Sequence, residues 1–569
     1  MRQLTSLDAQ FLAMEGPRTY GHVSGLAVYD PATAPGGEVT IKDVCRLVGE
    51  RLHLIPPFRW RLAHVPFDLD HPYWIEDPDF DIDFHIRESA VPPPGGAKQL
   101  AATVARIFAR PLDRAHPLWE LYLIHGLEDG RVALLTKVHH AAVDGMSGNE
   151  ILSVLLDSSP EGREIEPAEP RTPGRAPSQV EMLARGVLGL PRQPLRAIAG
   201  LPHVLGHLEG VPGVGAIPGS GTVARAASRA RHFLPGVPDG DVLDTVAVRA
   251  PHTRFNERIS PHRRYAFASV SLERIKALKN ALGITVNDVV MGLCATALRE
   301  WLLEHDELPD EPLVAMVPLS VRTSEEQATF GNRVSMMFVP IPTDVADPRE
   351  RLMRAHETMS VAKQQFRAVP ADILQDVTQF LPPAVFARAS RVTAQLHGLE
   401  RLRPLNLVIS NVPGPRDPLY CAGAKLEAHY PVSVITDGVG LNITCLSYLD
   451  HVDFGIVADR DQLDDAWPLM EGIERSLHEL DEVICGTGRQ RPNARNGRNG
   501  RKSKTAGRKR LEAQKARARA LRTVACPCHA TARTTTRARR PRRGGSSPPS
   551  APERRSSSWA ATPSTRRFA

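Results

Sequence analysis

The stretch Lys137-Val-His-His-Ala-Ala-Val-Asp-Gly-Met146 joins two segments of different pattern in a chain of 569 residues. Residues 131–138, which lead into it, are apolar and rich in β-branched types, so they predict a buried strand. Residues 146–156, which follow, place apolar side chains at helical spacing. The stretch is therefore a turn between a strand and a helix, and it fixes four positions: His139, His140, Asp144 and Gly145.

A histidine in such a turn is held by the strand and can still face a cavity. Its imidazole has an ordinary pKa near 6.5, which suits proton transfer at neutral pH. We therefore predict that His140 is a general base. Gly145 lets the backbone bend without a Cβ clash, and Asp144 can either orient an imidazole or brace the turn through an arginine.

Two other interpretations apply to the histidine pair. A histidine at a strand end is more often a structural residue than a catalytic one, and only the full set of four positions favours catalysis. Zinc binding is disfavoured, because adjacent residues of a strand point to opposite faces and His139 and His140 are poor ligands for one ion. We therefore expect no metal.

The stretch resembles the active-site motif of the acyl-CoA-dependent acyltransferase superfamily. Within it, the chain most resembles the bacterial wax ester synthase/diacylglycerol acyltransferase family. Six further segments carry the resemblance over residues 1–485, in the order of that family: Ser6-Leu-Asp-Ala-Gln-Phe11, Pro111-Leu-Asp-Arg-Ala-His-Pro-Leu-Trp-Glu120, Thr285-Val-Asn-Asp-Val289, Val317-Pro-Leu-Ser-Val-Arg322, Phe330-Gly-Asn332 and Asn406-Leu-Val-Ile-Ser-Asn-Val-Pro-Gly-Pro415.

The resemblance implies a two-lobed α/β fold of the chloramphenicol-acetyltransferase-like kind, with mixed sheets and a tunnel between the lobes. It implies an O-acyltransferase that moves a long-chain acyl group from acyl-CoA to diacylglycerol, giving triacylglycerol, or to a fatty alcohol, giving a wax ester. Acyl-CoA is then a substrate, and no cofactor is expected, because the thioester is already activated. Two alternatives stay open: a polyketide-linked or condensation-type enzyme with a carrier-protein acyl donor, and a non-catalytic protein that binds membranes or lipid droplets.

The resemblance also implies roles for the residues of the turn. His140 is the general base and His139 is structural. Asp144 forms a structural salt bridge with an arginine, for which Arg322 is a candidate, and Gly145 completes the motif.

A second group of residues is expected to bind substrate. The resemblance implies that Asn287 donates a hydrogen bond to the developing oxyanion and that Asp288 supports the start of a helix. Thr285 and Asp288 fit a capping pattern, so a simple helix start is the alternative. Ser410 and Asn411 follow a predicted strand and are expected as polar residues of the pocket, with a role in the turn as the alternative.

The segment Pro111–Glu120 is expected to serve structure. Trp119 and Pro111 are predicted to pack, as aromatic residues beside a strand usually do. Arg114 and Glu120 are expected to hold the segment to its neighbours.

The pattern divides the chain into four parts: residues 1–157 form a first lobe, 158–260 a Pro- and Gly-rich crossover between domains, 261–486 a second lobe and 487–569 a tail. Helices are predicted after Thr40, at 98–109, at 272–282 with a stop at Gly283, and at 285–303. Strands are predicted at 121–124, 131–138, 313–321, 334–340, 405–410, 441–448 and 452–457.

The tail differs in charge from the rest of the chain. From Arg489 onward, 24 Lys and Arg residues accompany two acidic residues, which leaves 47 basic and 62 acidic residues elsewhere. So few apolar residues cannot bury a core, so we expect a disordered basic tail. Such a tail can hold an enzyme on anionic lipid, bind nucleic acid non-specifically, or have no function. From Arg517 onward its composition also fits an out-of-frame translation.

Composition favours a cytoplasmic protein. The sequence has no uninterrupted apolar run of about 18 residues, so no transmembrane helix is predicted. The first ten residues lack an apolar signal core, and seven scattered cysteines suit reduced thiols. Cys526-Pro-Cys528-His529 lacks a second pair of metal ligands. Because the implied substrates are lipids, we expect peripheral association with the inner membrane or lipid droplets, and no specific nucleic-acid partner.

Overall fold

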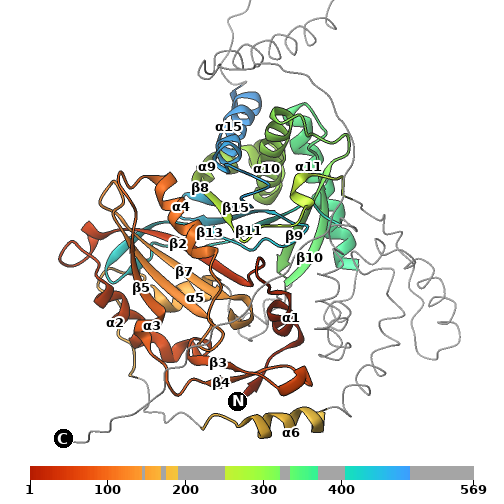
Figure 1. Ribbon diagram of the computed structural model, residues 1–569. Helices are drawn as coiled ribbons and strands as arrows, with labels where there is room; N and C mark the ends of the chain where they lie inside the picture. Colours follow the sequence, from red (N-terminus) through yellow and green to blue (C-terminus); the bar gives the residue numbers. More distant parts are fainter. Residues whose placement is uncertain (144–147, 168–174, 190–249, 321–333, 369–403, 487–569) are drawn as a thin grey trace, which may run out of the picture. The chain divides into compact units, whose positions relative to one another are not determined.

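Strands from both halves of the chain build the N-terminal sheet, as the computed structural model shows (Figure 1). Its six strands follow the order β12-β13-β2-β7-β6-β5. In that order they span Tyr420–Cys421, Ala424–Val432, His22–Asp30, Val132–His139, Trp119–His125 and Ile86–Ala90. The structure describes residues 1–143, 148–167, 175–189, 250–320, 334–368 and 404–486.

The C-terminal sheet also has six strands, in the order β10-β9-β11-β14-β15-β8. They span Val334–Ile341, Leu313–Ser320, Leu407–Val412, Leu441–Tyr448, His451–Asp459 and Arg263–Ser271. β11 is parallel to both β9 and β14, and β5 is parallel to β6 in the N-terminal sheet. The mixed sheets that the sequence predicts are therefore confirmed. A small third sheet contains β1 (Arg2–Gln3), β4 (Tyr73–Glu76) and β3 (Trp60–Ala63).

Helices cover both sheets. Those of the N-terminal half are α1 (Ser6–Met14), α2 (Ile41–Arg51), α3 (Ile82–His85), α4 (Ala97–Phe108), α5 (Gly148–Leu155) and α6 (Gln179–Gly189). Those of the C-terminal half are α9 (Leu272–Leu282), α10 (Val286–Glu304), α11 (Pro348–Ala368) and α15 (Trp467–Ile484).

Local signals fix the helix ends that the sequence predicts. Thr40 and Thr285 each form a capping box, with Asp43 and Asp288 respectively, and α2 and α10 begin at the next residue. α9 ends at Gly283, whose φ of 68° is left-handed and favours glycine. The predicted helices and strands are all found within a few residues of their expected bounds.

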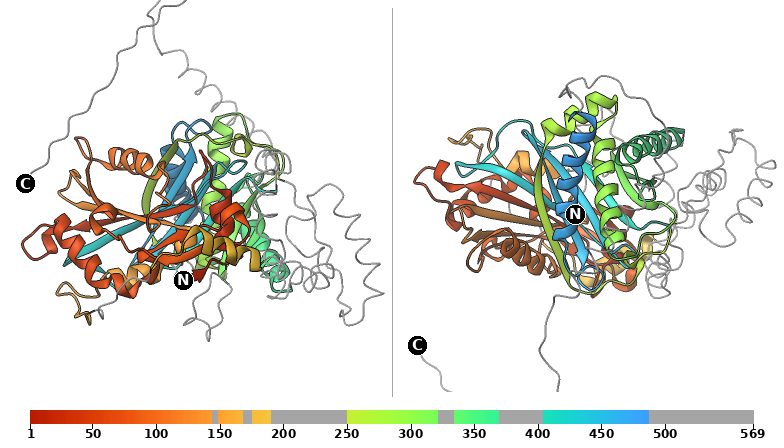
Figure 2. Two further views of the ribbon diagram at one scale, coloured as in Figure 1. Left: turned by 60° about the horizontal axis from the view of Figure 1, so that its bottom comes forward. Right: turned by 90° about the horizontal axis from the view of Figure 1, so that it is seen from above.

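Each sheet has its own cores. In the N-terminal sheet, α4 packs on one face, while α2 and α5 contribute to a core on the other. In the C-terminal sheet, α9, α10, α11 and α15 bury their apolar sides in one core and lie together on one side, as Figures 1 and 2 show.

β13 links the two sheets. It pairs with β2 over Val432 to Lys425, although it lies in the second half of the chain, and it also contacts β14 and β15. The sheets therefore do not follow the predicted division of the chain, because two strands from 261–486 complete the first sheet. Of the predicted crossover, α6 is described, whereas residues 190–249 and the tail lie outside the described residues.

In the described part of the chain, no single helix is long and apolar enough to cross a membrane. α9 and α10 reach that length and composition only together, and they are bent by 105°.

Candidate active site

The histidine turn lies where the sequence places it. β7 ends at His139, the 3-10 turn η5 (His140–Val143) begins at the next residue, and α5 follows. The predicted strand, turn and helix are confirmed. Asp144, Gly145 and Arg322 lie outside the described residues, so their roles stay predictions.

His139 is buried and both of its ring nitrogens face a partner. The backbone N–H of Ala141 donates to Nδ1 at 3.0 Å, which places the ring proton on Nε2. Nε2 lies 3.1 Å from Oε1 of Glu15, close enough for an electrostatic contact but without hydrogen-bond geometry. A hydrogen bond therefore holds one side of the His139 ring, and a carboxylate lies beside the other.

Glu15, which follows α1, gathers partners from three segments. Its Oε1 accepts from the backbone N–H of Gly21 at 2.7 Å, and its Oε2 accepts from Arg114 at 2.5 and 3.1 Å. Burial raises the pKa of Glu15, but the contacts with His139, Gly21 and Arg114 outweigh it and lower the pKa to about 2. Glu15 therefore stays ionised at neutral pH.

His140 is held through its backbone and its ring. Its N–H donates to the carbonyl oxygen of Gly21 at 2.8 Å. Its ring stacks on Phe11 of α1, with centroids 4.5 Å apart and planes 9° from parallel. Burial, and secondarily the proximity of His139, lower the pKa of His140 from 6.5 to about 4. The imidazole is therefore neutral at physiological pH and can accept a proton.

The segment Pro111–Glu120 supports this region. Arg114 binds Glu15, and Glu120 lies 3.2 Å from the buried Nζ of Lys137 on the neighbouring strand. Trp119 is buried and donates to the carbonyl oxygen of Phe58 at 2.8 Å. Pro111, in contrast, is exposed in the turn after α4, so the prediction that it packs is wrong.

Asn287 and Asn411 meet in the second lobe. Nδ2 of Asn411, on β11, donates to Oδ1 of Asn287, in the first turn of α10, at 3.2 Å. Oδ1 of Asn411 accepts from the thiol of Cys445 at 3.4 Å. Since Oδ1 of Asn287 is the acceptor, its amide N–H groups point elsewhere and suit donation to a ligand. Ser410 is directly opposite Thr444 in the parallel pair of β11 and β14.

Asp288 has contacts of another kind. Its buried carboxylate accepts from the backbone N–H of Thr285 at 2.9 Å, and its own N–H donates to the Thr285 hydroxyl. Oδ2 also lies 2.7 Å from Nδ1 of His356 on α11. The capping pattern predicted at Thr285 is confirmed, and it occupies the Asp288 carboxylate.

One hydrophobic core connects the two groups. Ala141 and Ala142, which follow His140, are buried in the same core against which Val412, the residue after Asn411, packs. Leu446 and Tyr448 of β14 belong to it as well. The residues after His140 and the end of β11 therefore pack in the same hydrophobic core.

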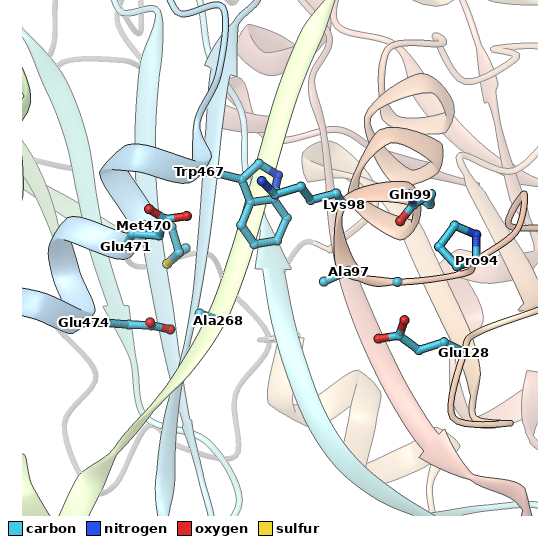
Figure 3. Close-up of a pocket in the computed structure, with 11 residues that line it drawn as sticks. Pro94, Ala97, Lys98, Gln99, Glu128, Ala268, Trp467, Met470, Glu471 and Glu474 are labelled. Carbon is cyan, nitrogen blue, oxygen red and sulfur yellow. The ribbon is translucent and has the colours of Figure 1, made fainter. Parts of the chain in front are cut away.

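A cavity of about 440 Å³ lies elsewhere, between the start of α4 and α15 (Figure 3). Lys98 extends over the Trp467 ring there, 5.8 Å from its centroid, beside Glu128, Glu471 and Glu474. Phe108, at the other end of α4, is not among the residues that line this cavity, and it lies about 15 Å along the helix from Lys98. Its carbonyl oxygen is 2.8 Å from Nε2 of His22, the neighbour of His139 across the sheet. The cavity is thus remote from the turn, and the interlobe tunnel stays a prediction.

Within the described ranges, no cluster of three or more His, Cys, Asp or Glu side chains is arranged to hold a metal ion.

Comparison with known proteins decides the family. The model of the wax ester synthase/diacylglycerol acyltransferase catalytic domain matches residues 4–290, and that of the family's C-terminal domain matches residues 330–481. The chain belongs to the wax ester synthase/diacylglycerol acyltransferase (WS/DGAT) family. The catalytic-domain match contains both the histidine turn and Asn287, and the C-terminal match contains Asn411.

Relatives agree with this WS/DGAT assignment. A putative diacylglycerol O-acyltransferase of Mycobacterium bovis is 35% identical over 84% of this chain and 98% of its own length. The solved wax ester synthase/diacylglycerol acyltransferase from Marinobacter aquaeolei VT8 is 31% identical, with a TM-score of 0.60, over 85% of this chain and all of that one. The family, the two-lobed mixed α/β fold and the acyltransferase class predicted from the sequence are confirmed.

A more distant structure shares the fold alone. The trichothecene 15-O-acetyltransferase from Fusarium sporotrichioides is 13% identical, with a TM-score of 0.51, over 84% of this chain and 95% of that one. The WS/DGAT chain therefore has the architecture of a wider group of acyltransferases.

Proposed function

We propose that this WS/DGAT chain transfers a long-chain acyl group from acyl-CoA to diacylglycerol, and to a fatty alcohol as a second acceptor. Support for diacylglycerol comes from the relatives named for that acceptor, and support for the fatty alcohol comes from the family and from the Marinobacter enzyme. The observation that carries the chemistry is His140, a neutral, stacked imidazole at the end of β7.

His140 acts as the general base. A ring nitrogen takes the hydroxyl proton of the acceptor as its oxygen bonds to the thioester carbonyl carbon. The carbonyl oxygen becomes an oxyanion, and the amide N–H groups of Asn287 stabilise it. The C–S bond then breaks, the CoA thiolate takes the proton from the imidazolium, and the ester and CoA leave. No covalent acyl-enzyme forms.

The low pKa of His140 suits both proton transfers. A pKa near 4 keeps the imidazole neutral in the free enzyme, so it is available to accept a proton. The imidazolium that forms is in turn a strong acid, which favours protonation of the thiolate. Asp144 and Gly145 keep the structural roles that the family motif implies, and Ser410 and Asn411 line the acceptor side.

The location of the enzyme follows from its substrates. Diacylglycerol and long-chain alcohols partition into lipid, so the enzyme works in the cytoplasm at the inner membrane or at lipid droplets. The basic tail provides attraction to anionic lipid, at up to about 1 kcal/mol for each Lys or Arg near the surface.

A transfer assay tests the proposal. Radiolabelled palmitoyl-CoA is given to the purified full-length chain with diacylglycerol or hexadecanol, and the lipid products are separated. His140→Ala should lower kcat by about 10²- to 10⁴-fold, the usual contribution of a general base. The control is His125→Ala, another histidine at a strand end, which is partly exposed and 3.3 Å from Glu88. Failure to acylate either alcohol, or equal loss in both variants, would overturn the proposal.

A further inference from the structure

The residues around Glu15 form a connected set that the chemistry above does not use. None of its members is among the residues predicted to bind substrate. Gly21 accepts a hydrogen bond from the N–H of His140 and donates one to Glu15, and Arg114 donates to Glu15. We propose that Glu15 is a positioning residue for acyl transfer, and that Arg114 acts through it to orient His139 and His140. This inference rests on the proposed role of His140 as the base.

The first path runs through the backbone. The Glu15 carboxylate accepts from the N–H of Gly21, and the carbonyl oxygen of Gly21 accepts from the N–H of His140. One residue, Gly21, therefore lies between the carboxylate and the backbone of the base. A shift of Glu15 moves Gly21, and a shift of Gly21 moves the start of η5.

The second path runs through the His139 ring. The Ala141 N–H occupies Nδ1 and leaves the proton on Nε2, which faces Glu15. The carboxylate lies 3.1 Å from this nitrogen, so its negative charge favours the proton on Nε2 electrostatically. Ala141 directly follows His140, so the fixed ring also anchors the backbone on the other side of the base.

A third path runs through helix α1. Glu15 follows α1, and Phe11 of that helix stacks on the His140 ring. Arg114 donates to Glu15 and also to the carbonyl oxygen of Leu12, at 2.8 Å, so it holds the last turn of α1 and the carboxylate together. Arg114 thus helps to fix the position of α1, whose Phe11 stacks on His140.

The space around Gly21 shows how closely these groups fit. A Cβ at Gly21 would stand 2.6 Å from Nε2 of His139 and 3.3 Å from Oε1 of Glu15. The backbone, the carboxylate and the imidazole therefore meet with no room for a methyl group. A side chain at Gly21 would therefore displace the His139 ring or the Glu15 carboxylate.

Glu15→Gln tests the proposal, because glutamine keeps the shape and one acceptor but removes the charge. We expect kcat to fall about 100-fold, as for a catalytic group displaced by about 1 Å, with the KM for palmitoyl-CoA within about twofold. Arg114→Met should lower kcat less, and the loss in the double variant should be smaller than the product of the two single losses, since Arg114 and Glu15 hold the same turn. Guanidinium ion should restore part of the rate of Arg114→Ala.

A matched ion pair provides the control. Arg274 and Asp481 join α9 to α15 at 2.9 Å, with side chains about as exposed as that of Arg114. Arg274→Met should lower the melting temperature as Arg114→Met does but leave kcat unchanged. Equal kcat in Glu15→Gln and the wild type, additive losses in the double variant, or a KM effect alone would overturn the proposal.

A spectroscopic readout separates this proposal from the proposed function. The ¹H and ¹⁵N resonances of the His139 Nε2–H, assigned with His139→Gln, should shift between the wild type and Glu15→Gln, because the charge beside that proton is removed while the Ala141 N–H keeps the tautomer. The positioning role falls if these resonances are unchanged. An inactive wild type with the expected shift overturns the acyl-transfer proposal and leaves the Glu15 contact to His139 in place.

Discussion

Each lobe contains a largely buried carboxylate beside an imidazole, and the two pairs differ in what they join. In the C-terminal lobe, Asp288 lies 2.7 Å from His356 and closes a capping box with Thr285, three residues away. In the N-terminal lobe, Glu15 lies 3.1 Å from His139 and also binds Arg114, 99 residues away. The first pair secures the start of α10 and joins it to α11, whereas the second ties three segments to the histidine turn.

This difference allows effects on the free energy of unfolding to be separated from effects on kcat. The Asp288 carboxylate caps α10 and contacts α11, away from the histidine turn, so it contributes mainly to the free energy of unfolding. A carboxylate that gathers distant segments also sets their relative position. Substitutions in the two pairs should therefore affect different measurements.

The largest effect on stability is expected from Asp288→Ala. It removes the hydrogen bond from the Thr285 N–H to the carboxylate and leaves His356 without its carboxylate, so the free energy of unfolding should fall by about 2 to 3 kcal/mol. Urea denaturation measures this loss. Asp43→Ala, which removes a similar capping box without a histidine, should cost only about 1 kcal/mol. Equal costs would show that His356 does not contribute.

The Glu15 pair should depend on pH in acid. Its pKa is about 2 in the folded protein and 4.5 ordinarily, so the unfolded chain binds the proton first. The stabilisation, about 3 kcal/mol, is complete above pH 4.5 and is lost as the pH falls toward 2. The difference in unfolding free energy between the wild type and Glu15→Gln should therefore shrink from pH 6 to pH 3. A constant difference would contradict the low pKa.

Substitution of two glycines, each packed against a histidine ring, tests whether displacement of the histidine turn lowers kcat. Gly21→Ala would press a methyl group on the His139 ring, and Gly25→Ala would press one on the His429 ring. Both should lower the melting temperature. Only Gly21→Ala should also lower kcat, by about 100-fold, because it displaces the turn. Comparable kcat losses in both variants would mean that the turn is no more sensitive than the sheet.

The smallest effect is expected from Phe11→Ala, which exposes the His140 ring to water. In the wild type, the acid limb of kcat/KM should lie near pH 4, because only the neutral imidazole accepts a proton. Loss of the stacked ring should lower kcat about tenfold and move the limb upward, toward pH 6.5, as desolvation is relieved. A limb that stays in place would exclude burial by Phe11 as the cause of the low pKa.

The sequence predicts those parts of the structure that depend on local pattern. The caps at Thr40 and Thr285, the stop at Gly283 and the strand before His139 all follow from residues within a few positions of each other. The family motif adds His140 and Asn287, which the structure places at the end of β7 and the start of α10.

Contacts between residues far apart in the sequence cannot be predicted from such local patterns. Glu15 has no motif of its own, and only the fold brings Arg114 and His139 to its carboxylate. Phe11 belongs to a quoted segment of the sequence, but nothing in the spacing shows that it stacks on His140. The charge of Arg114 was a usable signal, since a partly buried arginine needs a carboxylate partner.

Because β13 pairs with β2, the N-terminal sheet cannot be completed until most of the chain has been synthesised. After His139 has been made, about 290 further residues must follow before Val432 completes β13, which takes about 15 to 60 s at common rates of translation. During that time β2 presents an unpaired edge, on which another chain can add a strand. A chain that ends before residue 420 cannot form β13 and therefore keeps this edge of β2 unpaired. We expect nascent chains of this protein to depend on chaperones until β13 has been synthesised.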